Sequence, residues 1–210
     1  VYALSNAHVF ALQGSQPNGA VLTGTTGDRI LQPGRVDMTA QGCGSSLEIE
    51  AAVVGRLWDY EPIVVSRKAS NLVDAAIARL DDPDDVGTAT PADGYGTPSL
   101  PTWPAAVGLE VQKYGRTTKW TLGNVTGINA TVVIGYDAGQ ARFVKQIVIS
   151  GANGSSFSAG GDSGSLIVTK NGNHPVGLLF AGSSTTTIAN RIDDVLDAVV
   201  GLGVSIDVGP

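Results

Sequence analysis

The stretch Gly160-Gly161-Asp162-Ser163-Gly164-Ser165 decides how the rest of the chain is interpreted. Glycine close to Ser163 on both sides lets the backbone turn tightly and leaves the serine hydroxyl exposed as a candidate nucleophile. The backbone N–H groups of the preceding glycines can face a developing negative charge. The apolar run that follows, Leu166-Ile167-Val168, predicts a buried strand. A glycine- and serine-rich run is also typical of a plain loop, so the interpretation depends on the other motifs.

Two further stretches each place a catalytic residue type at the edge of an apolar strand. They are Leu4-Ser5-Asn6-Ala7-His8-Val9 and Asn71-Leu72-Val73-Asp74-Ala75-Ala76-Ile77-Ala78. A serine hydroxyl needs a base at neutral pH, and an imidazole suits that task. Of the two histidines, His174 stands in a predicted exposed hairpin turn, so His8 is the candidate base. The alternatives are a structural histidine at position 8 and a loop-capping aspartate at position 74.

The order His8, Asp74, Ser163 and the local contexts resemble the chymotrypsin/trypsin-like serine protease family. The segment Tyr114-Gly115-Arg116-Thr117-Thr118 is similar to the Gly-Arg-Thr-Thr turn of its bacterial branch, the alpha-lytic and streptogrisin type. This resemblance implies a serine endopeptidase in which His8 is the general base, Asp74 orients it and Ser163 forms an acyl-enzyme. It implies no cofactor and no metal.

The resemblance also assigns the residues around this triad. The backbone N–H groups of Gly161 and Ser163 would form the oxyanion hole. Asp162 would form a buried ion pair with Arg116 and thereby shape the oxyanion loop. The alternative for Arg116 is a surface turn residue.

Position relative to Ser163 places the floor of the primary specificity pocket near Phe157 and its wall along Phe180-Ala181-Gly182. No acid stands at the floor, so a small or medium apolar substrate side chain is expected rather than Lys or Arg. Many family members have a serine at the position of Phe180, hydrogen-bonded to the triad aspartate, and that contact is expected to be missing here. The expected partner is a protein or peptide substrate, with the chain's own upstream segment as an alternative.

Composition limits the other classes of function. The 28 glycines and 10 prolines among 210 residues favour short strands and tight turns over long helices. A net charge of −6 argues against nucleic acid as a partner, because phosphate binding needs a basic face. No apolar run is long enough to predict a membrane span. The single Cys43 cannot form an intramolecular disulfide, which fits a cytoplasmic protein, whereas the resemblance also allows a secreted one.

The expected architecture is all-β, with two six-stranded Greek-key barrels and a C-terminal helix. The predicted units are residues 1–80 (first barrel, with His8 and Asp74), 81–108 (proline-rich linker), 109–187 (second barrel, with Ser163) and 188–210 (helix and tail). Because His8 lies so close to Val1, the first barrel is expected to lack its N-terminal strands, and Val1 is not expected to be the natural start.

Two local patterns predict particular elements. Apolar and polar residues alternate in Leu47-Glu48-Ile49-Glu50-Ala51, which predicts a half-exposed strand. Apolar residues recur at helical spacing from Ile188 to Val199, which predicts the terminal helix, with Thr187 as its N-cap and Gly201 as its stop.

Some alternatives remain open at this point. The acidic cluster Asp81, Asp82, Asp84 and Asp85 is interpreted as a solvated turn, since its spacing lacks the alternation of a calcium-binding loop. The rivals of the endopeptidase hypothesis are a protease-fold scaffold, a self-cleaving module with little turnover in trans, and an esterase that uses the same acyl chemistry.

Overall fold

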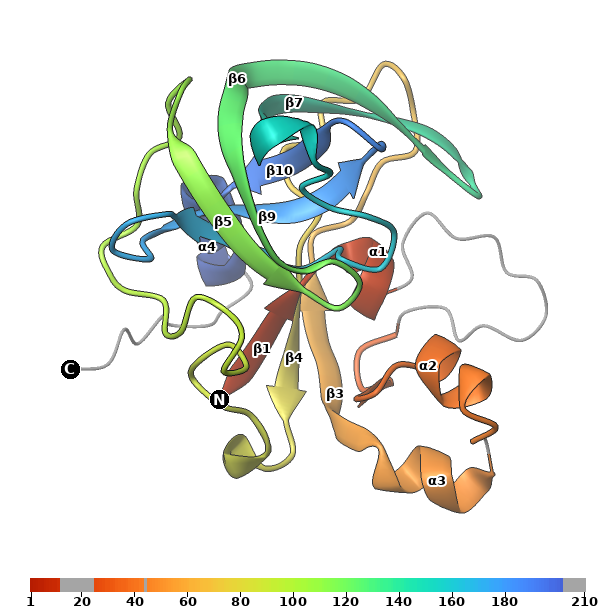
Figure 1. The fold of residues 1–210 in the computed structure, drawn as a ribbon. Coiled ribbons are helices and arrows are strands. Elements are labelled where there is room, and N and C mark those ends of the chain that lie inside the picture. Colours follow the sequence, from red (N-terminus) through yellow and green to blue (C-terminus); the bar gives the residue numbers. More distant parts are fainter. Residues whose placement is uncertain (12–24, 44, 202–210) are drawn as a thin grey trace.

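Two β-sheets, one from each half of the chain, pack against each other in the computed structural model, which describes residues 1–11, 25–43 and 45–201 (Figure 1). The first sheet contains β1 (Tyr2–Ser5), β2 (Arg29–Leu31), β3 (Val53–Tyr60) and β4 (Ala76–Leu80). Its strands are antiparallel and lie in the order β1-β4-β3-β2. Within the described residues this sheet has four strands, fewer than the six of the expected barrel.

The second sheet is a closed six-stranded barrel in the order β10-β7-β6-β5-β8-β9. Its strands are β5 (Glu110–Gly115), β6 (Lys119–Tyr136), β7 (Gly139–Gly151), β8 (Leu166–Thr169), β9 (Pro175–Gly182) and β10 (Thr187–Arg191). The β8–β9 hairpin predicted after the serine motif is present. Buried aliphatic side chains such as Val111, Val125 and Ile149 fill the interior. The predicted all-β class is therefore confirmed.

The helices are short except at the end of the chain. They are α1 (Ala7–Phe10), α2 (Arg35–Ala40), α3 (Ser46–Ala51) and α4 (Ile192–Gly201), with 3-10 turns η1 (Pro83–Asp85) and η2 (Ala152–Gly154). The predicted terminal helix exists, but it begins at Ile192. The proposed N-cap, Thr187, instead opens β10, which pairs with β7 on one side and β9 on the other. None of the described helices is long and apolar enough to cross a membrane.

The strand predicted at residues 47–51 is wrong, because this segment is the helix α3. Ser45 is its N-cap, and the Ser45 side chain accepts a hydrogen bond from the Glu48 backbone. The Glu48 carboxylate in turn accepts from the Ser45 backbone N–H at 2.8 Å. This reciprocal capping box satisfies two otherwise free backbone donors, and it starts a helix despite the alternating pattern.

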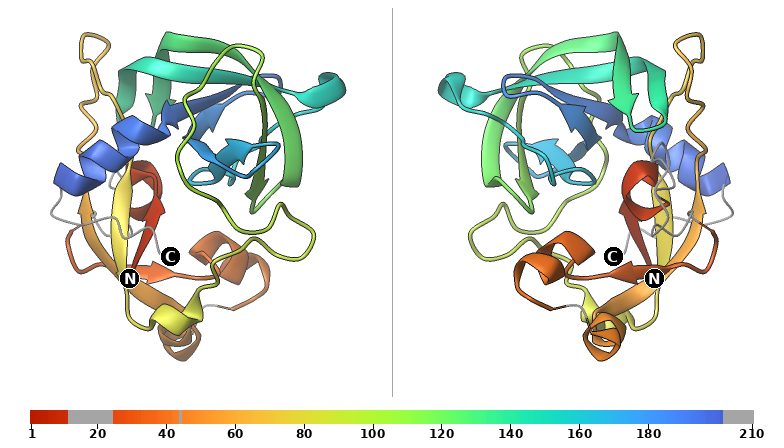
Figure 2. Two further views of the ribbon diagram at one scale, coloured as in Figure 1. Left: turned by 90° about the vertical axis from the view of Figure 1, so that its left-hand side faces the viewer. Right: turned by 90° about the vertical axis from the view of Figure 1, so that its right-hand side faces the viewer.

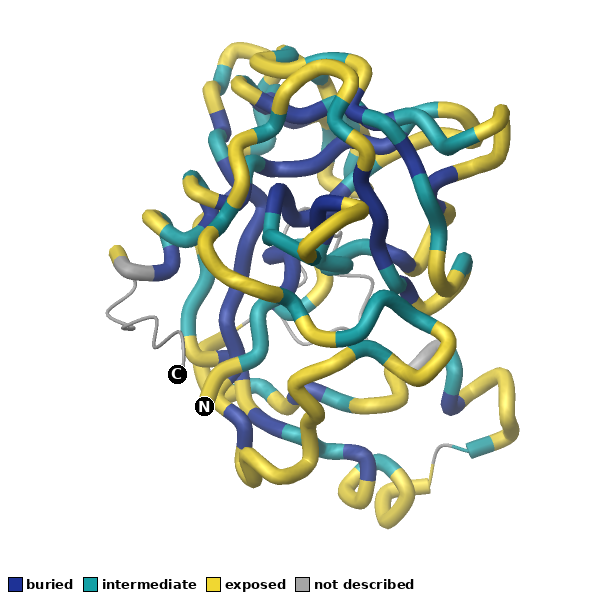
Figure 3. Tube along the Cα trace, turned by 60° about the vertical axis from the view of Figure 1, so that its left-hand side comes forward, coloured by how far each residue is buried: buried dark blue, intermediate teal, exposed yellow. Residues whose placement is uncertain are grey.

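A shared apolar core joins the two halves. Ala76 and Leu57 of the first sheet pack with Phe143 and Phe180 of the barrel, whose rings lie 4.8 Å apart. Asn71 forms an isolated parallel bridge with Phe143, so the segment before β4 is bonded directly to β7. Buried residues follow the strands of both sheets, while many of the connections between them are exposed (Figure 3). The junction between the halves is thus part of the core.

Two segments reinforce this arrangement. Helix α4 contacts β9 and β10, and its buried Ile192 and Val195 share an apolar cluster with Ile77 of β4 (Figure 2). The predicted linker, residues 81–108, has no strand and runs over the β8–β9 hairpin. There the backbone N–H of Ser99 donates to Asn173 O at 3.0 Å, and that of Trp103 donates to Pro175 O at 2.7 Å.

Candidate active site

His8 and Asp74 meet at the junction between the two halves of the chain. His8 lies in α1, directly after β1, and Asp74 lies just before β4, the strand paired with β1. The His8 Nδ1 atom is 2.6 Å from Asp74 Oδ2, and the His8 backbone N–H donates to Asp74 Oδ1 at 3.1 Å. The Asp74 side chain is fully buried, whereas that of His8 is 23% exposed. A buried carboxylate therefore holds the Nδ1 edge of a partly exposed imidazole.

The backbone at Asp74 is fixed from both sides of the junction. Asn6 Nδ2 donates to the Asp74 carbonyl at 2.8 Å, and the Asp74 N–H donates to Asn190 Oδ1 at 3.0 Å. Asn190 Nδ2 donates to Gln146 Oε1 at 2.8 Å, and Gln146 Nε2 donates to Leu72 O at 2.8 Å. Asn190 and Gln146 belong to the barrel, so barrel side chains set the position of the aspartate.

Tyr136 is a contact of Asp74 that the sequence reasoning missed. Its hydroxyl donates to Asp74 Oδ2 at 3.1 Å from the end of β6, 62 residues further along the chain. Burial, with the charge of Asp74 and the hydrogen bond to it, raises the pKa of Tyr136 well above its usual range. The carboxylate contact that was expected to be missing because of Phe180 is thus made by another residue. No local motif marks Tyr136, because the contact depends on how far the β6–β7 hairpin reaches.

Ser163 is half-buried in a loop whose backbone is held on both sides. The Gly164 N–H donates to Leu179 O at 2.9 Å, and the Ser165 N–H donates to Asp162 O at 3.1 Å. Gly164 has a φ of +87°, and a Cβ there would collide with Ser5 Oγ. The serine loop is therefore packed on the end of β1, three residues before His8.

Two features of this loop bear on catalysis. Of the hydrogen bonds within the described segments, none uses the backbone N–H of Gly161 or Ser163, which leaves both donors for a ligand. Ser163 and His8, both of which are described, form no hydrogen bond with each other. Such a contact is often long in the absence of substrate. The arrangement therefore provides the Asp74 carboxylate as a hydrogen-bond acceptor and the His8 imidazole that it orients. It also provides the backbone N–H groups of Gly161 and Ser163 as two free donors.

Asp162, predicted to pair with Arg116, is bound by other groups. Its carboxylate is fully buried and lies 3.5 Å from the Nζ of Lys113, whose side chain is also fully buried. It accepts hydrogen bonds from Thr117 N at 2.7 Å, Thr118 Oγ1 at 2.6 Å and Ala159 N at 3.0 Å. Burial alone would raise the pKa of Asp162, but these hydrogen bonds and Lys113 together lower it. Desolvation lowers the pKa of Lys113.

The predicted Arg116–Asp162 ion pair is therefore wrong. The Arg116 side chain is half exposed and forms a salt bridge with Asp37 of α2 through Nη2, with Nε 3.0 Å from Asp37 Oδ2. The turn that carries Arg116 still reaches Asp162, but through the backbone of Thr117 and the hydroxyl of Thr118. Lys113, on the adjacent strand, supplies the buried cation because its stem runs inside the barrel rather than along its surface. Lys113 Nζ also donates to Lys119 O at 2.9 Å.

The predicted substrate-binding residues lie in different environments. Phe157 is 2% exposed and belongs to the barrel core, and Phe180 is 3% exposed within the shared core. Ala181 is half-buried and Gly182 is exposed at the end of β9. Beside Phe157, the hydroxyls of Ser158 and Thr187 lie 2.5 Å apart. The rings of Phe157 and Phe180 thus lie beneath the surface formed at Ala181 and Gly182 and do not project from it.

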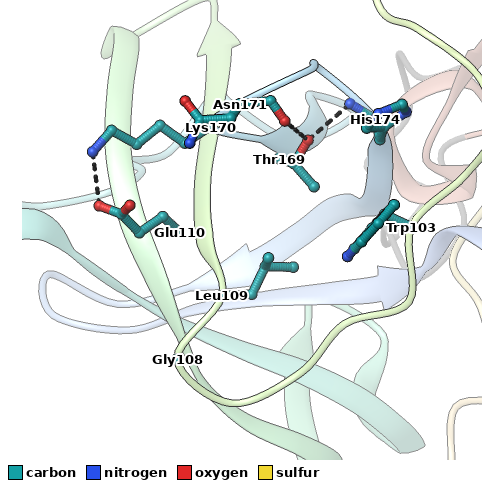
Figure 4. Close-up of a pocket in the computed structure, with 8 residues that line it drawn as sticks. All are labelled: Trp103, Gly108, Leu109, Glu110, Thr169, Lys170, Asn171 and His174. Atoms are coloured by element: carbon teal, nitrogen blue, oxygen red, sulfur yellow. Dashed lines mark hydrogen bonds and ion pairs between the residues drawn. The ribbon is translucent and has the colours of Figure 1, made fainter.

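A pocket of about 390 Å³ lies elsewhere, between the linker, β5 and the β8–β9 turn (Figure 4). It is lined by Trp103, Gly108, Leu109, Glu110, Thr169, Lys170, Asn171 and His174. His174 stacks on Trp103 and has its Nδ1 3.0 Å from the carbonyl oxygens of Ser99 and Pro101. The ring of this histidine is therefore held by residues of the linker. In the part of the chain that the structure describes, no group of three or more His, Cys, Asp or Glu could hold a metal ion.

Comparison with known proteins places the chain among peptidases. The model of the family described as peptidase family S64 matches residues 46–184. No curated protein shows significant similarity. Among solved structures, a glutamic-acid-specific serine protease that uses a histidine triad in substrate binding is 22% identical, with a TM-score of 0.56 over 95% of this chain and 84% of that one.

Two bacterial proteases are also similar. Thermobifida fusca protease A is 22% identical, with a TM-score of 0.52 over 70% of this chain and 72% of that one. A Nocardiopsis protease is 18% identical, with a TM-score of 0.51 over 93% of this chain and 80% of that one. At these identities the likeness shows the fold, which is that of the chymotrypsin-like serine proteases.

Proposed function

Because the chain belongs to peptidase family S64, we propose that it is a serine endopeptidase whose chemistry is carried by Ser163, His8 and Asp74. The observation that carries this proposal is the pair of hydrogen bonds between His8 and the buried Asp74. These bonds lie at the junction where the serine loop packs on Ser5. A buried aspartate, an imidazole oriented by it and a half-buried serine in an adjoining loop are the three parts that acyl transfer requires.

In the proposed first step, Ser163 Oγ attacks the carbonyl carbon of the scissile peptide while its proton passes to His8 Nε2. The His8 Nδ1–H remains bonded to Asp74 Oδ2, whose negative charge stabilises the imidazolium. The new oxyanion accepts hydrogen bonds from the N–H groups of Gly161 and Ser163. The C–N bond then breaks, His8 gives its proton to the leaving amine, and the acyl group stays on Ser163.

In the second step, water replaces the amine. His8 removes a proton from the water, and the resulting hydroxide attacks the acyl carbon. The tetrahedral intermediate collapses, the ester C–O bond breaks, and Ser163 recovers its proton from His8. These two steps regenerate the free serine and the neutral histidine, and they require no cofactor.

The free edge of β9 supports a peptide as the substrate. Ala181 and Gly182 pair with β10 on one side. On the other side β8 pairs only as far as Leu178, so no described strand pairs with residues 180–182 there. An extended peptide can add to such an edge through backbone hydrogen bonds. Phe157 would form the floor of the primary pocket, with Phe180 beneath its wall, and we propose a small or medium apolar side chain as the preferred fit.

Fluorophosphonate labelling tests the proposal. The wild type is expected to label, and Ser163→Ala and His8→Ala are expected not to label. Ser155→Ala, which alters an exposed serine bonded to Ala152 O, serves as the matched control and is expected to label normally. A folded wild type that does not label would contradict the proposal and favour a scaffold. Equal labelling with cleavage of esters but not peptides would favour an esterase.

A further inference from the structure

We infer that Tyr136 is a positioning residue of the proposed triad, and that its hydroxyl holds the Asp74 carboxylate in the orientation that His8 requires. The inference rests on the proposed function, because it concerns the same triad. It assigns a part of the active site to the β6–β7 hairpin, which no sequence motif marks.

The hydrogen bonds of the Asp74 carboxylate explain why a third donor matters. Oδ1 accepts from the His8 backbone at 3.1 Å, and Oδ2 binds His8 Nδ1 at 2.6 Å. Both of these bonds come from the residue that the carboxylate has to orient. Tyr136, at 3.1 Å from Oδ2, is the one donor to this carboxylate from outside residue 8 among the described residues. The hydrogen bond from Tyr136 therefore fixes the carboxylate independently of the position of the imidazole.

The Tyr136 ring is itself held in place. Tyr136 pairs with Gly139 at the tip of the β6–β7 hairpin, and a Cβ on Gly139 would meet Val65 at 3.0 Å. The ring lies tilted against Phe143, with centroids 6.4 Å apart, and against His8, at 6.0 Å. The hairpin tip thus rests on the first half of the chain, and the phenol reaches Asp74 from the barrel side. Burial beside a carboxylate keeps the hydroxyl protonated, so it remains a donor.

The decisive variant is Tyr136→Phe, which removes the hydroxyl and keeps the ring. The matched control is Tyr60→Phe, because Tyr60 packs on the same core and its hydroxyl has no bond to the triad. We expect kcat of Tyr136→Phe to fall about tenfold, the effect of losing one charge-assisted hydrogen bond, while KM stays within about twofold. Tyr60→Phe is expected to keep both parameters.

A second measurement does not depend on turnover. The His8 Nδ1 proton in its short bond to Asp74 should give a downfield proton NMR signal, which is assigned by its absence in His8→Ala. In Tyr136→Phe this signal should shift or broaden, and in Tyr60→Phe it should not. An active wild type, with kcat and the signal both unchanged in Tyr136→Phe, would overturn the inference and leave the proposed function intact. An inactive wild type would overturn the proposed function, and the NMR signal alone would then decide the role of Tyr136.

Discussion

Replacement of Lys113 by methionine tests the account of the serine loop most directly. The Lys113 side chain is fully buried and lies 3.5 Å from the fully buried Asp162 carboxylate, so Lys113→Met removes one partner of a buried ion pair. Breaking such a pair typically costs about 3–5 kcal/mol. Asp162 would keep its hydrogen bonds from Thr117, Thr118 and Ala159. The expected loss of unfolding free energy is therefore at the lower end, about 3 kcal/mol.

The matched variant is Arg116→Met, which removes the cation that sequence resemblance had assigned to the same aspartate. Arg116 is half exposed and pairs with Asp37, so its removal should leave the free energy of unfolding unchanged within error. Equilibrium urea unfolding of both variants measures the difference, provided that the m-values equal that of the wild type. Lys113→Met should also lower the rate of fluorophosphonate labelling, since Asp162 stands between Gly161 and Ser163 in the chain.

The opposite order of effects would refute this reasoning. If Arg116→Met destabilised the chain as much as Lys113→Met or more, the arginine would be the partner of Asp162 in solution. A double variant with Asp162→Asn separates the cases. The effects of Lys113→Met and Asp162→Asn should be strongly non-additive, and those of Arg116→Met and Asp162→Asn should add.

Three further outcomes are expected. The pKa of Asp162 is lower in the folded chain than its ordinary value of 3.8, so the unfolded chain binds the proton first as the pH falls. The stability that this carboxylate contributes is therefore present above pH 3.8 and is lost as the pH falls through the folded pKa. Urea unfolding between pH 5 and pH 2 should show a loss of stability with acid that is smaller in Asp162→Asn. Ser45→Ala removes the capping box of α3 and should cost about 1 kcal/mol in thermal or urea unfolding, whereas an unchanged midpoint would contradict the cap. Gly164→Ala places a side chain at a φ of +87° against Ser5, and it should abolish labelling and destabilise the chain by more than about 1 kcal/mol; a normally labelled variant would show that the loop does not pack on β1.

The parts of the site that the sequence predicted are those set by local chemistry. The glycines around Ser163 predict a loop with an accessible hydroxyl, and the structure places that loop against β1. His8 and Asp74 each stood at the edge of an apolar run, and the pairing of β1 with β4 brings the two together. The domain boundaries and the catalytic roles of these residues remain predictions.

The parts that sequence reasoning missed depend on distances in space. Lys113 and Arg116 are only three residues apart, and the sequence does not show that the first points into the barrel and the second along its surface. Tyr136 reaches Asp74 only because β6 is long enough to extend beyond the barrel. The error at α3 was of another kind, since a Ser45–Glu48 capping box was present in the sequence and was outweighed by an alternating pattern.

The placement of Asp74 has a consequence for the stage of folding at which the proposed active site forms. Its backbone and its carboxylate are both held by barrel side chains, Asn190 and Tyr136, although Asp74 itself belongs to the first half. With the role proposed for Asp74, docking of the two halves also completes the active site. We expect a nascent or partly unfolded chain, in which each half has formed but the halves have not met, to be inert toward its neighbours. The proposed activity is in this way conditional on complete folding.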